Sequence, residues 1–469
     1  MENYNSLVNI LADIKQNKIT LRGLVLHYLS NIKNQADLNA FVEVFEEEAI
    51  SQAEIVQQKI DAGTAGKLAG LVIGIKDNIC YKNHKVSASS KILSGFESVY
   101  NATVIERLLA EDAIIIGRLN CDEFAMGASN ETSFYGPVLN ATDRTRVSGG
   151  SSGGAAVAVQ ADLCQVAIAS DTGGSIRQPA AFCGVMGIKP TYGRVSRNGL
   201  IAYASSFDQI GPITKSIHDM QLVMEVISGK DEADATSSSQ PVVHYLEAAI
   251  TPKQKIGYIK ECVFHEGIDT EIKNAILSVI EKLKQQGHDV VELSFPYVDF
   301  LVPVYYVLTT AEASSNLSRF SGLTHGYRSN NATDLESTFK KSRSEGFGKE
   351  VKRRIMLGTF VLSAGSYDAY YTKAQKVRKL VQAKTEELFE NVDFLLSPTT
   401  PSTAFKLGEK TSDPIAMYLA DIFTVHANIC GNPAISVPAG NHSNGMPIGV
   451  QLMAKPFCEG AMMKIASTI

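Results

Sequence analysis

Tryptophan is absent from this 469-residue chain, and histidine is absent from a long central stretch. No histidine occurs between residues 85 and 217, and the nine histidines elsewhere form no H-E-x-x-H pair or similar ligand spacing. We therefore expect no metal site. A nucleophile within residues 85–217 also has no histidine close to it in the sequence that would act as its base.

The chain also lacks the features of a secreted or membrane protein. Its seven cysteines are an odd number, widely scattered and without a C-x-x-C pair, which is typical of a reducing compartment. Residues 1–18 contain acidic residues and no long apolar core, unlike a secretory signal. Gln160, Asp162 and Gln165 interrupt the nearest candidate for a membrane-spanning run. We expect a cytoplasmic protein that makes no membrane contact.

Charge and hydrophobicity narrow the class of protein further. Acidic residues number 49 against 44 basic ones, so the formal net charge is −5 and no general affinity for nucleic acid is expected. Hydrophobic residues make up 45% of the chain and charged residues 20%, which favours a sizeable core over disorder.

Apolar runs and helical periodicities alternate along most of the chain, which predicts an α/β protein built on a mixed sheet flanked by helices. Helices are expected over residues 4–62 and at Ala102–Glu111, Ser216–Ser228, Thr270–Gln286 and Ser366–Phe389. Strands are expected at Leu71–Ile75, Ala113–Ile116, Gln165–Ala169, Lys255–Ile259, Asp289–Ser294, Val392–Leu396, Ala434–Val437 and Ile448–Leu452.

We expect residues 1–469 to form a single domain. Its N-terminal part, about residues 1–65, is expected to be helical, and residues 231–240 are expected to form a surface loop. Residues 314–350 are rich in Ser, Asn, Gly and Arg and are expected to form a loop-rich cover over the active site.

Two glycine-rich turns, each with a serine, stand out in the central stretch. Ser151 lies in Gly149–Gly154, and Ser175 lies 24 positions later in Asp171–Arg177. The second turn stands between an expected strand and an expected helix, where free backbone N–H groups collect and can stabilise an oxyanion. Taken alone, such a Gly/Ser segment is more typical of a flexible linker.

Lys76 follows the first expected strand and is the candidate base. Free lysine has a pKa of about 10.4, but burial disfavours its charge and lowers that value. A neutral Lys76 would deprotonate Ser151, which in turn would deprotonate Ser175 for attack on an amide. The alternative is a solvated surface lysine.

These elements, in this order, resemble the amidase signature family. The resemblance continues through residues 179–184 and 187–191. It implies the amidase signature fold and a catalytic triad of Lys76, Ser151 and Ser175, with a cis peptide at Ser151. The expected oxyanion hole consists of the backbone N–H groups of Thr172, Gly173, Gly174 and Ser175.

Further motifs are similar to the branch of this family that works as glutaminase subunits of tRNA-dependent amidotransferases. They span residues 122–127, 129–133, 205–212, 341–348 and 350–358. The resemblance implies that glutamine is hydrolysed and that its ammonia passes to a partner, the B subunit, which converts Glu-tRNA(Gln) to Gln-tRNA(Gln). It also implies a third member, the C subunit, contact with tRNA(Gln) mainly through the B subunit, ATP and Mg²⁺ required by the complex, and no cofactor in this chain.

The same resemblance assigns Arg354 to the α-carboxylate of glutamine and Asp421 to its α-ammonium group. Without it, Arg354 would be interpreted as part of a basic surface cluster and Asp421 as half of a structural ion pair. Tyr305 and Tyr306 either line the pocket or belong to the core. Asp171 either acts electrostatically or stabilises its turn. Two rival functions stay open: a stand-alone amidase for another small amide, and a non-catalytic scaffold.

Overall fold

The structure is a computed structural model that describes residues 4–248 and 250–469. Residues 1–3 and 249, which fall within the expected domain 1–469, lie outside the described residues. Within the described part, one 11-stranded sheet has the order β1-β3-β2-β4-β6-β5-β10-β11-β9-β7-β8. The strands are β1 Phe41–Val44, β2 Val72–Lys76, β3 Ile114–Leu119, β4 Val166–Asp171, β5 Met186–Lys189, β6 Gln209–Thr214, β7 Lys255–Ile259, β8 Asp289–Leu293, β9 Phe394–Pro398, β10 Ala434–Asn441 and β11 Pro447–Ala454.

The sheet is mixed: parallel pairs lie toward its two ends, antiparallel pairs run through its middle, and the edge strand β1 is antiparallel to β3. Strand β2 is parallel to both β3 and β4, and β7 is parallel to both β8 and β9. Because parallel neighbours end at the same sheet edge, the carboxyl ends of β2 and β4 lie side by side. This arrangement places Lys76 next to the segment that follows Ala169.

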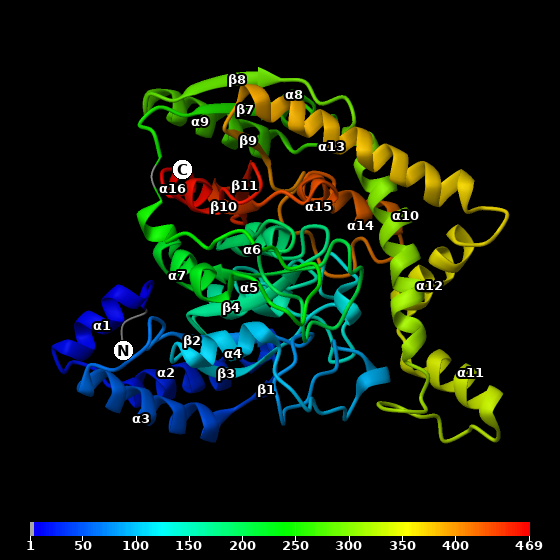
Figure 1. Ribbon diagram of the computed structural model, residues 1–469, viewed down its shortest axis with the longest axis horizontal. Coiled ribbons are helices and arrows are strands. Elements are labelled where there is room, and N and C mark those ends of the chain that lie inside the picture. Colours follow the sequence, from blue (N-terminus) through cyan, green and yellow to red (C-terminus); the bar gives the residue numbers. More distant parts are fainter. Residues whose placement is uncertain (1–3, 249) are drawn as a thin grey trace.

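Helices cover both faces of the sheet (Figure 1). They are α1 Leu7–Lys15, α2 Leu21–Asn34, α3 Glu46–Ala62, α4 Thr103–Ala110, α5 Gly153–Gln160, α6 Arg177–Cys183, α7 Ile217–Ile227, α8 Lys260–Val263, α9 Thr270–Gln285, α10 Val298–Asn316, α11 Leu335–Gly346, α12 Lys349–Val361, α13 Lys373–Asn391, α14 Pro414–Tyr418, α15 Val425–Cys430 and α16 Glu459–Ala466. Short helical turns are η1 Ala36–Leu38, η2 Lys91–Leu93, η3 Glu123–Ala125, η4 Tyr245–Glu247, η5 Leu317–Arg319, η6 Asp368–Thr372 and η7 Leu419–Asp421.

Alternate residues of the central strands pack into different cores. Val166 and Ile168 join a cluster with α4, α7, α9 and α16, whereas Ala167 and Ala169 join one with α2, α3, α5 and α6. Because both faces are covered, β2 and β4 are buried along their whole length. A further cluster joins α10, α12, α13 and α15, and Figure 1 shows α10, α12 and α11 along one side of the molecule.

The expected α/β architecture with a mixed sheet flanked by helices is confirmed. All eight expected strands overlap observed ones, but β1, β5 and β6 were not expected. Strand β1 interrupts residues 4–62, which otherwise hold the helices α1, α2 and α3. Strand β6 contains Gly211 and Pro212, two residues that are usually excluded from central strands.

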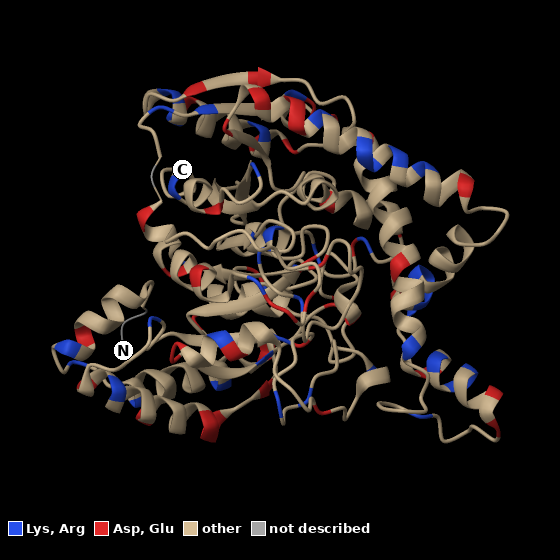
Figure 2. Ribbon diagram, in the orientation of Figure 1, with Lys and Arg blue, Asp and Glu red and all other residues tan. Residues whose placement is uncertain are grey.

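Residues 314–350 are more helical than expected. They hold the end of α10, η5, the whole of α11 and the start of α12, with irregular stretches at residues 320–334 and 347–348. An Asp334 capping box begins α11, which is a start signal that the polar composition obscured. Figure 2 shows the charges on outer helices such as α13, while the central strands are mostly uncharged.

Candidate active site

Lys76 is the last residue of β2 and is fully buried among hydroxyl groups. Its Nζ donates to Ser151 Oγ at 2.7 Å, Ser152 Oγ at 2.8 Å and Ser170 Oγ at 3.0 Å. Ser170 reaches it from the parallel strand β4, and the other two serines come from the turn before α5. The fold therefore brings Lys76 and Ser151 into direct contact.

The surroundings of Lys76 disfavour its charged form. Every hydrogen-bond acceptor of Lys76 in the described part of the chain is an uncharged oxygen. Burial lowers the pKa of Lys76 to about 8, although more distant acidic groups such as Asp122 and Asp171 act in the opposite direction. At a pH near 8 a large fraction of this amine is neutral and able to accept a proton.

The first glycine turn is shaped by close packing around its backbone. Gly149 has a φ of +79°, and the peptide bond between Gly150 and Ser151 is cis. A Cβ at Gly150 would overlap the Asp122 carboxylate, so only glycine fits there. Gly150 N–H donates to Gln178 Oε1 at 2.9 Å, which ties the turn to α6.

The second turn joins β4 to α6 and is held from inside by Asp171. This carboxylate accepts from Gly174 N–H at 2.9 Å and Ile176 N–H at 3.1 Å, and it pairs with Arg177 at 3.1 Å. Burial disfavours the charge of Asp171, but Arg177, Asn428 and Lys189 together outweigh burial and the pKa falls to about 2. Of the two alternatives for Asp171, the contacts favour stabilisation of the turn.

Ser175 lies where the two turns meet. Its carbonyl accepts from Ser152 N–H at 3.2 Å, which fixes the second turn against the first. Ser175 is 8% exposed, whereas Lys76 and Ser151 are fully buried. Of the expected triad, Ser175 is thus the residue that an incoming molecule can reach. The assignment of catalytic roles to the three residues stays a prediction.

The expected oxyanion donors are not equivalent. Gly174 N–H is already bonded to Asp171, whereas the N–H groups of Thr172, Gly173 and Ser175 have no acceptor in residues 4–248 or 250–469. Three free N–H groups in one turn form a concave donor set of the kind that binds an oxyanion. We therefore regard Thr172, Gly173 and Ser175 as the available donors.

Tyr305 and Thr424 pack directly on this donor set. A Cβ at Gly173 would overlap the Tyr305 ring, and a Cβ at Gly174 would overlap the Thr424 side chain. Thr424 Oγ1 also donates to Gly173 O at 2.7 Å. Tyr305 thus lines the turn, and Tyr306 stacks on Tyr418 with ring centroids 3.9 Å apart.

Arg354 projects from α12 and is 3% exposed, unlike its exposed neighbour Lys352. Its Nε donates to Glu350 Oε1 and its Nη1 to Tyr203 OH, both at 2.8 Å. Its Nη2 donates to no residue that the structure describes. The guanidinium is therefore held in place with one edge left for a carboxylate.

Asp421 ends η7 and lacks the ion-pair partner that a buried acid requires. Its Oδ1 is buried and has no hydrogen-bond partner in the described chain. Burial raises the pKa of Asp421 well above its usual range, while Arg354 acts in the opposite direction. Thr424 Oγ1 donates to Asp421 O at 3.0 Å as well as to Gly173 O, so Asp421 stands beside the oxyanion turn.

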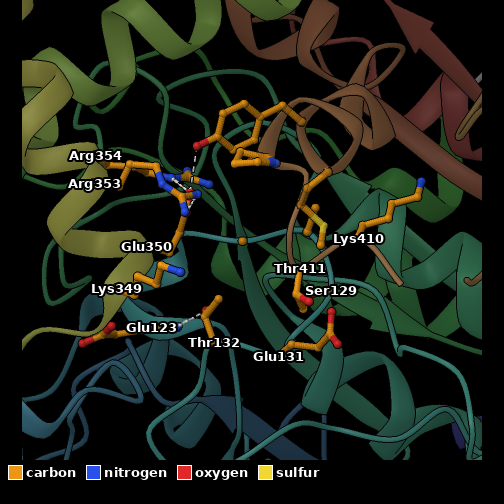
Figure 3. A pocket seen from close by; sticks show the side chains of 15 residues that line it. Glu123, Ser129, Glu131, Thr132, Lys349, Glu350, Arg353, Arg354, Lys410 and Thr411 are labelled. Carbon is orange, nitrogen blue, oxygen red and sulfur yellow. Dashed lines mark hydrogen bonds and ion pairs between the residues drawn. The ribbon is translucent and has the colours of Figure 1, made fainter. Parts of the chain in front are cut away.

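A cavity of about 260 Å³ opens next to these residues. Figure 3 shows Lys349, Glu350, Arg353 and Arg354 of α12 on one wall and Lys410 and Thr411 on the other. Ser129 also lines this cavity, and the backbone N–H of Ser129 lies against Gly150. The triad itself does not line this cavity, so we call it the vestibule: an outer space beside the first glycine turn.

Sequence reasoning missed three polar groups at the site. Ser152 and Ser170 contact Lys76, and Glu350 holds both Arg354 and Tyr418. Ser152 and Ser170 flank motif residues, which was the available signal. Their contact with Lys76 depends on strands that only the fold brings together.

The described residues contain neither a metal centre nor a membrane-spanning helix. In residues 4–248 and 250–469, no group of three or more His, Cys, Asp or Glu side chains is arranged to hold a metal ion. Within the same ranges, no helix combines the length and apolar character needed to cross a membrane.

The chain belongs to the amidase family, whose model matches residues 23–463. It is 50% identical over 467 residues to the A subunit of glutamyl-tRNA(Gln) amidotransferase from Chlorobium phaeobacteroides, covering 99% of this chain and 98% of that one. The same subunit of Koribacter versatilis is 49% identical over 460 residues, covering 97% and 96%. The crystal structure of this subunit from Thermotoga maritima matches with a TM-score of 0.78 at 39% identity, covering 96% of this chain and 91% of that chain. The expected resemblance to the amidase signature family is confirmed.

Proposed function

We propose that this chain is the glutaminase subunit of a glutamyl-tRNA(Gln) amidotransferase. Relatives that carry this enzyme's name match it over nearly its whole length at about half identity. A stand-alone amidase is less well supported, because the full-length similarity extends through α12 and its Arg354, outside the serine turns.

In the proposed reaction, Ser175 Oγ attacks the side-chain carboxamide carbon of glutamine. Its proton passes to Ser151, whose own proton passes to Lys76. The free N–H groups of the second turn stabilise the negative oxygen, and the C–N bond then breaks as the leaving nitrogen takes a proton to form ammonia. Water hydrolyses the glutamyl ester on Ser175 to glutamate and restores the serine.

The same proposal gives Arg354 and Asp421 the recognition of the amino acid. The free edge of the Arg354 guanidinium suits the α-carboxylate, and the unpartnered Asp421 oxygen suits the α-ammonium group. A bound ammonium would stabilise the charged form of Asp421, which burial disfavours without a ligand by raising the pKa of this group. The buried oxygen of Asp421 is the observation that carries glutamine, rather than a simple amide, as the substrate.

Ammonia then passes to the B subunit, which amidates glutamate on tRNA(Gln) and uses ATP and Mg²⁺, with the C subunit as the third member. The net charge of −5 supports tRNA contact mainly through the partner. We place the complex in the cytoplasm, and the seven free cysteines of this chain support a reducing compartment.

The test compares ammonia release from glutamine and from butyramide, which has a carboxamide but no α-groups. The chain is purified with its partner subunits. The proposal expects a strong preference for glutamine in kcat/KM and co-purification of the B and C subunits. Equal use of both amides by a chain without partners would favour the stand-alone amidase.

A further inference from the structure

Glu123 lies outside the expected catalytic set, on the wall of the vestibule. It belongs to η3, is 3% exposed, and accepts hydrogen bonds from Gly348 N–H at 2.9 and 3.0 Å and from the Ser90 hydroxyl. Burial raises the pKa of Glu123 to about 7, although Ser90, Gly348 and Lys352 favour the charged form. The charged form of a buried carboxylate is stable only when other groups donate hydrogen bonds to it.

Gly348 is the N-cap residue of α12, immediately before Lys349. Its N–H has no acceptor other than Glu123 in the described chain, and a Cβ at Gly348 would overlap the Glu123 carboxylate. A negative charge here also faces the positive end of the helix dipole. Phe347 adds an apolar contact, because its ring stands 5.6 Å from that of Phe124. The start of α12 is thereby fixed to η3.

The other end of α12 is fixed against α10. A Cβ at Gly358 would overlap Thr310 O, so the two helices approach closely at that point. Arg354 lies between Gly348 and Gly358. The position of its guanidinium relative to the serines therefore depends on both ends of the helix.

The residue before Glu123 holds the catalytic turn. Asp122 N–H donates to Ser151 O at 3.0 Å, and its carboxylate lies under Gly150. Asp122 also accepts from Asn130 N–H at 2.9 Å. Two consecutive residues, Asp122 and Glu123, thus connect the turn of Ser151 to the helix that carries Arg354.

We propose that Glu123 is a positioning residue for the amino-acid substrate: it fixes the start of α12 so that Arg354 stands at the correct distance from Ser175. The inference rests on the glutaminase function proposed above. A group that acts in this way affects the binding of the α-carboxylate and leaves the chemistry of the carboxamide unchanged.

The test is Glu123→Gln in the complex with its partner subunits. The neutral amide keeps the shape but loses the charge and one acceptor oxygen. We expect KM for glutamine to rise about tenfold, which is the size expected for one lost charge-assisted hydrogen bond. The kcat for glutamine and the kcat/KM for butyramide are expected to stay within about twofold of native. In an Arg354→Ala background the same substitution is expected to raise KM no further.

Gly348→Ala disturbs the same contact from the other side and leaves the carboxylate intact, so it is expected to reproduce the rise in KM. Asp334→Asn is the matched control, because Asp334 caps α11, a helix without site residues, through Ser337 N–H at 2.7 Å. It is expected to leave KM unchanged. An unchanged KM in both Glu123→Gln and Gly348→Ala would overturn this inference and leave the proposed function standing. Equal losses of kcat/KM on glutamine and on butyramide would do the same. A native complex without preference for glutamine would overturn the proposed function and this inference with it.

Discussion

Two regions of the site differ in how completely their side chains are hydrogen-bonded. We call the surroundings of Lys76, Ser151 and Ser175, with Asp171 and Arg177, the catalytic cluster, and those of Arg354 and Asp421 the recognition region. In the cluster, Lys76 contacts three serine hydroxyls, and Arg177 donates to Asp171, Thr424, Gln451 and Asn428. In the recognition region, an oxygen of Asp421 and a nitrogen of Arg354 have no partner in the part of the chain that the structure describes. The protein completes the first set of bonds and leaves the second set open, which is why we propose that a ligand completes it.

This difference separates two tasks. The bonds of Lys76 and Arg177 fix the strand ends and turns before substrate arrives, while the free N–H groups of the second turn stay available for an oxyanion. Buried polar atoms without hydrogen-bond partners cost stability, and a substrate that bonds to them regains that free energy on binding. The comparison predicts that changes in the cluster affect every amide, whereas changes in the recognition region affect mainly amino-acid amides.

The largest effect is expected from Ser175→Ala, because it removes the proposed nucleophile. Ammonia release from glutamine and from butyramide should both be abolished, as measured with the purified complex. Amidation of Glu-tRNA(Gln) with free ammonium should continue at the native rate, since we propose that this chemistry lies in the partner subunit. Substantial glutaminase activity in Ser175→Ala would show that another group attacks the carboxamide.

Lys76→Arg is expected to be the next most severe change. Arginine keeps the positive charge but stays protonated at all accessible pH values, so it cannot act as a base. Loss of a general base typically costs about a hundred- to ten-thousandfold in rate. We expect kcat for glutamine and butyramide to fall equally and to match the values for Lys76→Ala. Near-native kcat in Lys76→Arg would instead give this residue a purely electrostatic role.

Asp421→Asn should produce a smaller loss that is confined to amino-acid amides. A charge-assisted hydrogen bond to the α-ammonium group contributes roughly 1.5–3 kcal/mol, or about ten- to a hundredfold in kcat/KM. Steady-state kinetics should show this loss for glutamine and almost none for butyramide. Equal losses on the two amides would mean that Asp421 supports the fold rather than the substrate.

The pattern of residues predicted the continuous apolar strands and the catalytic turns better than it predicted β1, β5 and β6. Strands β2 and β4 are continuous apolar runs, because helices cover both of their faces. Strand β6 carries Pro212 opposite Ile168 in its pairing with β4, and β5 has only four residues. Such strands are formed by their neighbours and have no local pattern of their own.

In the candidate site, too, the sequence predicted the motif residues but not the contacts that the fold creates between distant segments. Lys76, Ser151 and Ser175 were inferred from motifs, and the structure places them at adjoining strand ends and turns. The contact of Ser170 with Lys76 arises from the parallel pairing of β2 and β4. The contact of Glu123 with Gly348 joins segments 225 residues apart, so neither contact has a signal in the local sequence.

The pH dependence of kcat for the native complex, on glutamine and on butyramide, is the most direct test of whether a neutral Lys76 acts as the base. Burial lowers the pKa of Lys76 to about 8, and a lowered lysine pKa means that the active, neutral form is gained as pH rises through that value. Both amides are therefore predicted to show the same basic limb, with kcat rising through a pH of about 8 and levelling above it. A rise of kcat with pH for glutamine alone, or a rise centred near the pKa of free lysine at about 10.4, would contradict the claim that neutral Lys76 is the base for both amides.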